Sequence, residues 1–331
     1  MKVAINGFGR IGRSVFRILE ETDGIDVVAI NDLFDPDAMR YLLNHDTIMG
    51  PFGKDLTLEE GHFVTPKGRT QLLSEKDPAS LPWGELGIDA VIESTGVFRS
   101  REGLEKHLAA GAKRVLLTVP AKDDIDYTVV LGVNDDGLTP EHRIISNASC
   151  TTNCLAPMAR VLDESFGIVE GVINTVHAYT NDQRLADVPH SDWRRSRAAA
   201  ENIIPTSTGA AKAVGVVLPA LAGKLHGIAA RVPVPDGSVV DLFVELEKSV
   251  EPADVNAAVK EAAAGPLQGI LEYSERPIVS SDIIGNAHSS IFDASFTAVT
   301  SGHYLRVLNW YDNEWGYSQR VCDLLAKIDG W

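Results

Sequence analysis

The stretch "KVAINGFGRIGRSVFRILEE", residues 2–21, decides the fold of the first half of the chain. Its first five residues read as a short buried strand, and apolar residues then recur three and four positions apart, as on one face of a helix. Three glycines between strand and helix have the G-x-G-x-x-G spacing: Gly7, Gly9 and Gly12. Such glycines permit a tight turn, close approach of the backbone to a pyrophosphate, and close packing of helix on strand. The stretch therefore predicts the first unit of a dinucleotide-binding fold.

An acidic residue strengthens this interpretation, because a glycine motif alone is a weak signal. Asp32 ends the next predicted strand, "DVVAIND", about twenty residues after the glycines. A carboxylate there accepts a hydrogen bond from the adenosine ribose 2′-hydroxyl, and it repels a 2′-phosphate. We therefore expect NAD rather than NADP, with its pyrophosphate at the start of the first helix, where free amides and the helix dipole attract an anion.

The pattern of elements predicts an α/β protein with two domains. Strands and helices alternate over residues 1–149, which predicts a Rossmann-type parallel sheet covered on both faces. Residues 150–312 open with a helix and continue with long strands, which predicts an α+β catalytic domain with a largely antiparallel sheet. A long polar stretch within it, residues 180–209, has no clear periodicity, and loops of this length are usually functional. Residues 313–331 are expected to form a terminal helix.

Composition excludes several classes of protein. Of 331 residues, 44% are hydrophobic and 23% are charged, as in ordinary globular proteins, and no apolar run of about 18 residues could span a membrane. The first residues enter a strand at once, without a signal peptide, so we expect a cytoplasmic location. The net charge of −16 argues against nucleic-acid binding. Three cysteines are too few for a disulfide framework and lack zinc-type spacing, so no metal is expected.

One of the cysteines is a candidate nucleophile. Cys150 lies among small polar residues in "SNASCTTNC", at the predicted start of a helix, where amides and dipole lower a thiol pKa. A buried, inert thiol is the commoner role of a cysteine, and it suits Cys154 and Cys322 better. His177 ends the strand "GVINTVHAY" where the polar stretch begins, so it is a candidate base, although a surface role stays open.

A dinucleotide fold combined with a nucleophilic cysteine indicates oxidation of an aldehyde through a thioester. An aldehyde does not readily release hydride until a nucleophile has added to it, and a thiolate is a suitable nucleophile.

Longer motifs resemble those of the phosphorylating glyceraldehyde-3-phosphate dehydrogenase family. They are "INGFGRIGR", "SNASCTTNCLAP", "HAYTNDQ", "RRSRAAAENIIPTSTGAAKAV", "RVPVP", "SVVDL" and "WYDNEWGYS", and the resemblance runs from Lys2 to the terminal helix. It implies that Cys150 is the nucleophile and that His177 activates the thiol and acts as acid and base. It further implies that inorganic phosphate attacks the thioester, so that glyceraldehyde 3-phosphate and NAD yield 1,3-bisphosphoglycerate and NADH.

The resemblance also implies the binding residues and the assembly. Those for substrate and phosphate would be Ser149, Thr151, Thr180, Arg195, Thr208, Gly209 and Arg231. Those for NAD, besides the glycines and Asp32, would be Arg10, Ile11, Lys76, Thr118 and Asn313. The family implies that the terminal helix packs back on the dinucleotide-binding domain. It also implies a homotetramer in which a loop from about Tyr179 to Asn202 reaches a neighbour's cofactor site.

Some positions depart from the family pattern. Lys76 stands where an arginine is common, Phe34 replaces a smaller residue beside Asp32, and Val119 stands where alanine is usual. The run "VPDG", residues 234–237, departs from a more frequent "TPN", and the sequence offers no physical reason for the change.

Two other functions remain open at this point. Erythrose-4-phosphate dehydrogenase shares the cysteine chemistry but releases its product by hydrolysis, and Thr180 in "HAYTND" favours the glyceraldehyde enzyme over it. A non-catalytic, NAD-responsive redox sensor would use Cys150 with a resolving cysteine, for which Cys154, one helical turn away, is the candidate.

Overall fold

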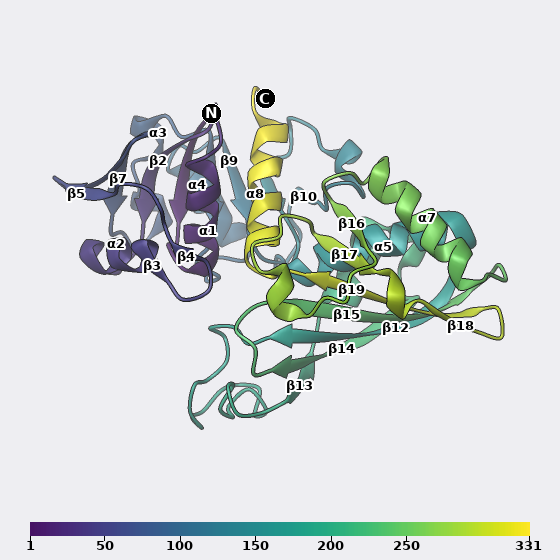
Figure 1. Ribbon diagram of the computed structural model, residues 1–331. Coiled ribbons are helices and arrows are strands. Elements are labelled where there is room, and N and C mark those ends of the chain that lie inside the picture. The colour runs from purple at the N-terminus through teal and green to yellow at the C-terminus, as the bar shows by residue number, and fades with distance from the viewer. The chain divides into compact units, whose positions relative to one another are not determined.

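The computed structural model describes residues 1–331, which divide into two compact units (Figure 1). Unit 1 comprises Met1–Val129, Asp136–Ala148 and Ser318–Trp331. Unit 2 comprises Val130–Asp135 and Ser149–Tyr317. None of the helices combines the length and apolar composition that a membrane span requires.

Unit 1 is built on a nine-stranded sheet with the order β10-β11-β9-β8-β1-β2-β7-β6-β5. All neighbours from β10 to β7 are parallel, and only β6 and β5 add antiparallel pairs at one edge. The strands are β1 (Lys2–Asn6), β2 (Asp26–Asn31), β5 (Thr57–Glu59), β6 (His62–Thr65), β7 (Gly68–Leu73), β8 (Ala90–Glu93), β9 (Arg114–Leu117), β10 (Tyr127–Thr128) and β11 (Ile144–Ser146). The predicted Rossmann-type parallel sheet is confirmed.

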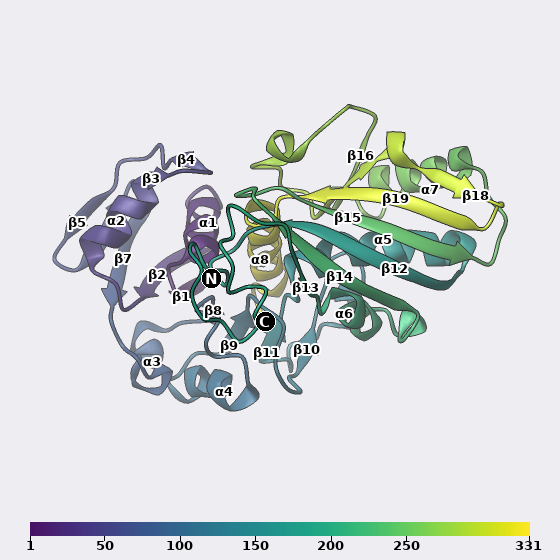
Figure 2. The same ribbon diagram turned by 90° about the horizontal axis from the view of Figure 1, so that it is seen from below.

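Helices cover both faces of this sheet. They are α1 (Arg10–Leu19), α2 (Pro36–Asn44), α3 (Trp83–Leu86), α4 (Arg101–Ala109) and, from Ser318 onward, α8 (Trp315–Ile328). The connections β1–α1–β2 and β8–α4–β9 step in opposite directions along the sheet. Because such crossovers are right-handed, α1 and α4 lie on opposite faces, as Figure 2 shows. The Sγ of Cys322 in α8 lies 3.9 Å from the carbonyl of Val15, so α8 packs beside α1.

A buried carboxylate ends strand β8. Glu93 is fully buried and accepts hydrogen bonds from the Asn6 side chain and the Thr95 amide. The Nε2 atom of His107 lies 3.0 Å from the same carboxylate, and the Trp83 indole donates to His107 Nδ1 over 3.0 Å. An indole N–H can only donate, so Nδ1 must be an acceptor and the proton resides on Nε2. His107 therefore donates through Nε2 to the carboxyl group of Glu93.

Unit 2 is built on an eight-stranded sheet that runs β13-β14-β12-β15-β19-β17-β16, with β18 paired to β19. Its pairs are antiparallel except β12 with β14 and β16 with β17, which confirms the largely antiparallel sheet expected for the second half. The strands are β12 (Ile168–Ala178), β13 (Ile204–Ser207), β14 (Leu225–Val232), β15 (Ser238–Leu246), β16 (Leu271–Ser274), β17 (Ser290–Asp293), β18 (Ala298–Thr300) and β19 (Tyr304–Tyr311).

Three helices pack on one face of the second sheet, and the other face is exposed. The helices are α5 (Cys150–Phe166), α6 (Ala210–Val217) and α7 (Pro252–Ala264), and Figure 2 shows them on the same side. On the opposite face, four large apolar side chains from neighbouring strands are about half exposed: Val172, Ile228, Phe243 and Tyr304. An apolar face of this kind normally packs against another surface.

The remaining elements lie in connections. A two-stranded sheet pairs β3 (His45–Asp46) with β4 (Gly50–Pro51). Short 3₁₀ helices span Pro78–Ser80, Asp135–Gly137, Pro219–Leu221, Ser280–Ile283 and Ala294–Phe296. The predicted long loop is present between β12 and β13, but it is shorter than the expected residues 180–209, because residues 204–207 form β13 and pair with β14. Within the loop, the only ladder contact is a single bridge between Arg184 and Ala198.

Replacing His107 with phenylalanine tests the buried network of unit 1. Phenylalanine keeps an aromatic ring at this position, but Glu93 loses a donor and the Trp83 indole loses its acceptor. We expect the free energy of unfolding, measured by urea denaturation, to fall by about 2–3 kcal/mol, because a hydrogen bond to a charged group contributes about 1.5–3 kcal/mol. The control is His142→Phe, at a half-buried ring stacked on Tyr127. An equal or smaller loss for His107→Phe would contradict the assignment.

Candidate active site

Helix α5 begins with the candidate nucleophile. Ser149 is the N-cap, and its hydroxyl accepts a hydrogen bond from the Thr152 amide over 3.1 Å. Cys150 is therefore the first helical residue, and its side chain is half-buried. Cys154, one turn further on, is fully buried, with its Sγ near the Asn309 carbonyl, and Cys322 is buried too. Of the three thiols, only Cys150 is accessible.

The predicted base lies beside this thiol. His177 is the last residue but one of β12, and its Nε2 atom lies 3.5 Å from the Sγ of Cys150. The ring is buried and meets the Tyr311 ring edge-on, with ring centroids 5.8 Å apart. This is hydrogen-bond distance for sulfur, so a proton can pass directly between the two side chains.

The other ring nitrogen of His177 is held by the backbone and by a cation. Its Nδ1 atom lies 2.7 Å from the carbonyl oxygen of Ala178 and 2.8 Å from Nη1 of Arg231. Arg231 also donates to the Ala178 carbonyl over 2.9 Å, because β14 pairs with β12 in a register that places Arg231 opposite His177. A guanidinium can only donate, so Arg231 hydrogen-bonds Nδ1 when Nδ1 is unprotonated, and Nδ1 donates to the Ala178 carbonyl when it carries the proton. In the second tautomer, Nε2 presents a lone pair to the thiol.

The charges of this pair are set mainly by burial. Burial and the neighbouring guanidinium of Arg231 lower the pKa of His177 to about 3, so the imidazole is neutral at ordinary pH. Burial also raises the pKa of the Cys150 thiol, while Arg231 and hydrogen bonds from the Thr151 amide and side chain lower it by less. The expectation of a net lowered pKa for Cys150 is therefore wrong. The helix start acts in the expected direction, but desolvation outweighs it.

A tyrosine that the sequence did not single out supports the start of α5. The hydroxyl of Tyr311 lies 2.8 Å from Thr151 Oγ1 and 2.8 Å from Thr175 Oγ1, and the ring is buried. Burial raises the pKa of Tyr311 well above its usual value, so it remains a neutral phenol. Only its place in the quoted motif "WYDNEWGYS" could have drawn attention to it.

A second polar group links the histidine strand to Asn313. Ser238 is fully buried, and its hydroxyl accepts a hydrogen bond from the Ala178 amide over 3.0 Å and donates one to Asn313 Oδ1 over 2.6 Å. Ser238 thereby links the side-chain amide of Asn313 to Ala178, the residue whose carbonyl contacts His177.

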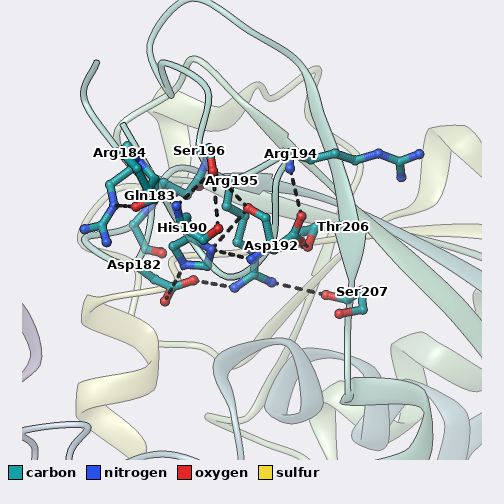
Figure 3. A network of polar contacts seen from close by, with 12 residues as sticks. Asp182, Gln183, Arg184, His190, Asp192, Arg194, Arg195, Ser196, Thr206 and Ser207 are labelled. Carbon is teal, nitrogen blue, oxygen red and sulfur yellow. Dashed lines mark hydrogen bonds and ion pairs between the residues drawn. The ribbon is translucent and has the colours of Figure 1, made fainter. Parts of the chain in front are cut away.

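Arg195 belongs to a polar network in the long loop (Figure 3). Its guanidinium forms an ion pair with Asp182, lies 3.6 Å from Asp192, and donates to Thr206 Oγ1 over 2.9 Å. The Thr206 hydroxyl in turn donates to Asp192 over 2.7 Å. Arg195 is thus already neutralised by two carboxylates, and an incoming anion must displace at least one of them.

The other predicted substrate residues lie around the start of α6 and of the long loop. Gly209 is the N-cap of α6, with no side-chain cap and open space where a Cβ would stand, and Thr208 Oγ1 accepts the Ala210 amide. The Thr180 amide donates to the Gln183 side chain over 3.3 Å. The structure joins Cys150, His177, Thr151 and Arg231 by direct contacts, and it shows no hydrogen bond from Thr180, Thr208 or Gly209 to that group.

The glycine loop of unit 1 has the features that a dinucleotide requires. Gly7 has φ +95°, and a Cβ on it would lie 2.6 Å from the Thr95 amide, so only glycine fits. A Cβ on Gly9 would meet no atom within 4 Å, which leaves open space at the N-terminus of α1. The first turn of α1 carries no acidic residue and no side-chain cap, so its amides are available to an anion.

The predicted ribose ligand borders the same loop. Asp32 follows β2 and accepts hydrogen bonds from the amides of Phe8 (2.6 Å) and Phe34 (3.1 Å), which fix its carboxylate beside the glycines. Arg10 forms an ion pair with Asp46, and Ile11 is half-buried in the first turn of α1. These residues fit NAD.

The last two predicted cofactor residues of unit 1 follow other strands. Lys76 is exposed after β7, and Thr118 follows β9 with its hydroxyl bonded to the Glu93 carbonyl over 3.1 Å. The structure contains no group of three or more His, Cys, Asp or Glu residues that could hold a metal ion.

Comparison with known proteins agrees with these two sites. The family model described as the C-terminal domain of glyceraldehyde 3-phosphate dehydrogenase matches residues 149–313, and the model of its NAD binding domain matches residues 1–101. The chain belongs to the glyceraldehyde 3-phosphate dehydrogenase family. Related proteins match over nearly their whole length. Glyceraldehyde-3-phosphate dehydrogenase 2 of Streptomyces avermitilis is 57% identical over 331 residues, covering 99% of this chain and 98% of the relative.

Two further relatives carry the name of the family. Glyceraldehyde-3-phosphate dehydrogenase of Streptomyces coelicolor is 58% identical and that of Geobacillus stearothermophilus is 55% identical, each covering 99% of this chain and 98% of the relative. Together with the domain matches, these similarities confirm the predicted family, the predicted NAD-dependent oxidoreductase activity and NAD as the cofactor.

Replacing His177 with glutamine tests the thiol–imidazole pair. The amide cannot accept the thiol proton as a base, so we expect kcat to fall by about 10²–10⁴-fold. Alkylation of Cys150 by iodoacetamide near neutral pH should slow as well. Because the pKa of His177 is about 3, wild-type alkylation should show no inflection from this imidazole between pH 5 and 8. His303→Gln, at a ring that lies 3.0 Å from the Leu246 carbonyl, is the matched control. Unchanged alkylation in His177→Gln would refute the pairing.

Proposed function

We propose that this family member oxidises glyceraldehyde 3-phosphate with NAD and inorganic phosphate to 1,3-bisphosphoglycerate, through a thioester on Cys150. The contact between Cys150 Sγ and His177 Nε2, 3.5 Å long at the start of α5, carries this proposal. An accessible thiol with a neutral imidazole beside it is the arrangement that covalent aldehyde chemistry needs.

The first half of the reaction uses the pair as nucleophile and base. His177 Nε2 takes the proton of the Cys150 thiol while Nδ1–H stays bonded to the Ala178 carbonyl. The sulfur adds to the aldehyde carbon, and the carbonyl oxygen becomes an alkoxide. Bound NAD supplies the hydride acceptor. Collapse of the alkoxide expels hydride and leaves a thioester on Cys150.

The second half releases the product. A phosphate oxygen attacks the thioester carbon, the C–S bond breaks, and the acyl phosphate departs while Cys150 leaves as a thiolate. His177 then returns the proton to the sulfur. Arg231, in contact with His177, favours each anionic stage and lowers the pKa of the thiol.

The substrate carries phosphate, and a second phosphate attacks, so two anions must be held by a protein with a net charge of −16. We assign this role to Arg195 and Arg231, with Thr180 and the open start of α6 at Thr208 and Gly209. The hydroxyls of Ser149 and Thr151 already have internal partners. These two residues therefore position the thiol, and any contact they make with substrate requires exchange of those bonds.

For the cofactor, we propose that the glycine loop, Arg10 and Ile11 hold the pyrophosphate. Asp32, Lys76 and Thr118 hold the adenosine side, and Asn313 holds the nicotinamide amide. We assign the dinucleotide-binding domain to residues 1–149 and the catalytic domain to residues 150–312. We assign residues 313–331 to a terminal helix, which we propose packs back on the first domain. The bond from Ser238 to Asn313 supports the last assignment, because it fixes the amide.

The alternative functions have less support. A redox sensor needs an accessible resolving cysteine, and Cys154 is fully buried. Thr180 stands at the place that favours the glyceraldehyde enzyme over erythrose-4-phosphate dehydrogenase. We propose the glycolytic and gluconeogenic reaction, in the cytoplasm.

We further propose a homotetramer. The exposed apolar face of the second sheet supports it, because a hollow there is lined by Val172, Phe243, Tyr304 and Arg306. In the long loop, Leu185 and Trp193 are also largely exposed, at 85% and 87%. Side chains of this size usually gain a partner surface in the assembled protein.

A steady-state assay with glyceraldehyde 3-phosphate tests the reaction. NADH formation should depend strongly on inorganic phosphate, and NAD should be preferred to NADP because the carboxylate of Asp32 repels a 2′-phosphate. Turnover that is indifferent to phosphate would favour the hydrolytic alternative. Cys150→Ser should abolish turnover and leave NAD binding intact, and retained turnover would reject the nucleophile.

Replacing Phe243 with aspartate tests the assembly. A carboxylate on the exposed apolar face should shift the sedimenting species from tetramer toward smaller forms, because it removes the apolar contacts of the Phe243 ring and must be desolvated in an interface, even beside Arg306. Tyr41→Asp, at a comparably exposed position on α2 in unit 1, is the control and should leave sedimentation unchanged. Equal behaviour of the two variants in sedimentation velocity would show that this face is not an interface.

A further inference from the structure

Two carboxyl groups are buried together close to the peptide that holds His177. Asp236 is 0% exposed and Asp312 is 1% exposed. They meet because β15 begins at Ser238 opposite the last residue of β19, Tyr311, so that the residues flanking these two strand ends are neighbours. Neither carboxyl belongs to the reaction described above.

The two groups differ in their hydrogen-bond partners. Asp312 accepts from the amides of Gly285 (2.7 Å), Glu314 (2.8 Å) and Trp315 (2.6 Å). Asp236 accepts on Oδ1 from the Gly237 amide over 2.8 Å, and its buried Oδ2 has no donor. Three amides therefore stabilise negative charge on Asp312, and only one does so on Asp236.

One proton shared by the carboxyl groups of Asp236 and Asp312 removes the charge repulsion between them. The acidic groups that act on Asp236 are Asp312 and Glu314, and the side chains of Asp236 and Asp312 interact directly. A hydrogen bond between these two carboxyl groups requires a proton on one of them. Two ionised carboxylates can only accept, so one of the pair must carry a proton. Asp312 has three amide donors and Asp236 has one, which places the proton on Asp236. In agreement, burial and the two acids raise the pKa of Asp236 to about 9.

We propose that Asp236 is a positioning residue that works as a neutral acid, donating its proton to Asp312 and holding the start of β15 against the end of β19. Asp236 affects the position of the catalytic pair, Cys150 and His177, through Ser238. That hydroxyl holds Asn313 on one side and the Ala178 amide on the other, and the Ala178 carbonyl holds the imidazole of His177.

The same assignment explains the departure "VPDG" from the more frequent "TPN". A protonated carboxyl presents an O–H donor to Asp312 where an asparagine would present an N–H donor. Gly237 has φ +85°, and a Cβ there would overlap the Ser280 carbonyl, so the backbone of this turn requires glycine.

Loss of the proton should oppose catalysis. A negative charge on Asp236 raises the pKa of the Cys150 thiol and breaks the bond to Asp312. Activity should therefore fall on the alkaline side as Asp236 ionises. Ionisation of Asp236 should also lower the free energy of unfolding. A carboxyl whose pKa is raised on folding stabilises the fold fully below its unfolded pKa, and this contribution is lost as pH rises toward about 9.

Two variants with opposite expected effects test the proposal in the full-length protein. Asp236→Asn keeps a donor to Asp312 and cannot ionise. Relative to its own maximum, its kcat at pH 9.5 should exceed that of wild type by about threefold or more, as removal of a titrating group predicts. Glu314→Gln removes an acid that raises the pKa of Asp236, so its alkaline limb should move to lower pH. The proposal would be overturned if the alkaline limb of the pH–rate profile were unchanged in both variants, or if it shifted in the same direction in both.

A spectroscopic readout separates this inference from the proposed function, on which its activity arm rests. In infrared difference spectra at pH 7, wild type minus Asp236→Asn should show the carbonyl band of one protonated carboxylic acid, and the band should vanish above about pH 9. This signal needs no turnover. If Asp236→Asn does not fold, titration of the same band in wild type and Glu314→Gln decides the matter. Absence of a protonated carboxyl in wild type at pH 7 would refute the proposal.

Discussion

The chemistry of unit 2 depends on one hydrogen bond, from His177 Nδ1 to the carbonyl of Ala178. In the tautomer that forms this bond, Nε2 presents its lone pair to the thiol of Cys150, and the contact of Nδ1 with Arg231 is then electrostatic rather than a hydrogen bond. The amide of the same residue, Ala178, donates to the hydroxyl of Ser238. Three strands, β12, β14 and β15, thus meet at the residue that orients the base, and a shift in any of them would alter the distance between sulfur and nitrogen.

Burial determines the charge states around this bond. The imidazole and the thiol are both neutral at rest, because each is desolvated more strongly than its neighbours can offset. Arg231 is the cation in contact with them, and it favours a thiolate while it disfavours an imidazolium. Cys150 and His177 are therefore suited to transferring a proton during the reaction, and they do not form a thiolate–imidazolium ion pair beforehand.

The buried carboxyl groups of the two units lie in different hydrogen-bonding environments. Glu93 in unit 1 is surrounded by hydrogen-bond donors, and it holds the ends of β1 and β8 together. Asp236 in unit 2 faces two other acids and lacks such donors, so it is proposed to keep its proton. The number of available donors, not burial alone, decides which carboxyl carries charge.

The sequence by itself determined what depends on near neighbours along the chain. Local pattern predicted the order of strand, glycines and helix in residues 2–21 and the start of a helix at Cys150, because turns and helix caps involve residues only a few positions apart. It also predicted the change from alternating strands and helices to antiparallel strands. The tertiary structure alone decided the net direction of the Cys150 pKa, the role of Tyr311, the neutralisation of Arg195 by Asp182, and the pairing of Asp236 with Asp312. Each of these depends on desolvation and on charges or donors brought together by packing rather than by the local pattern, and no periodicity in the sequence encodes those distances.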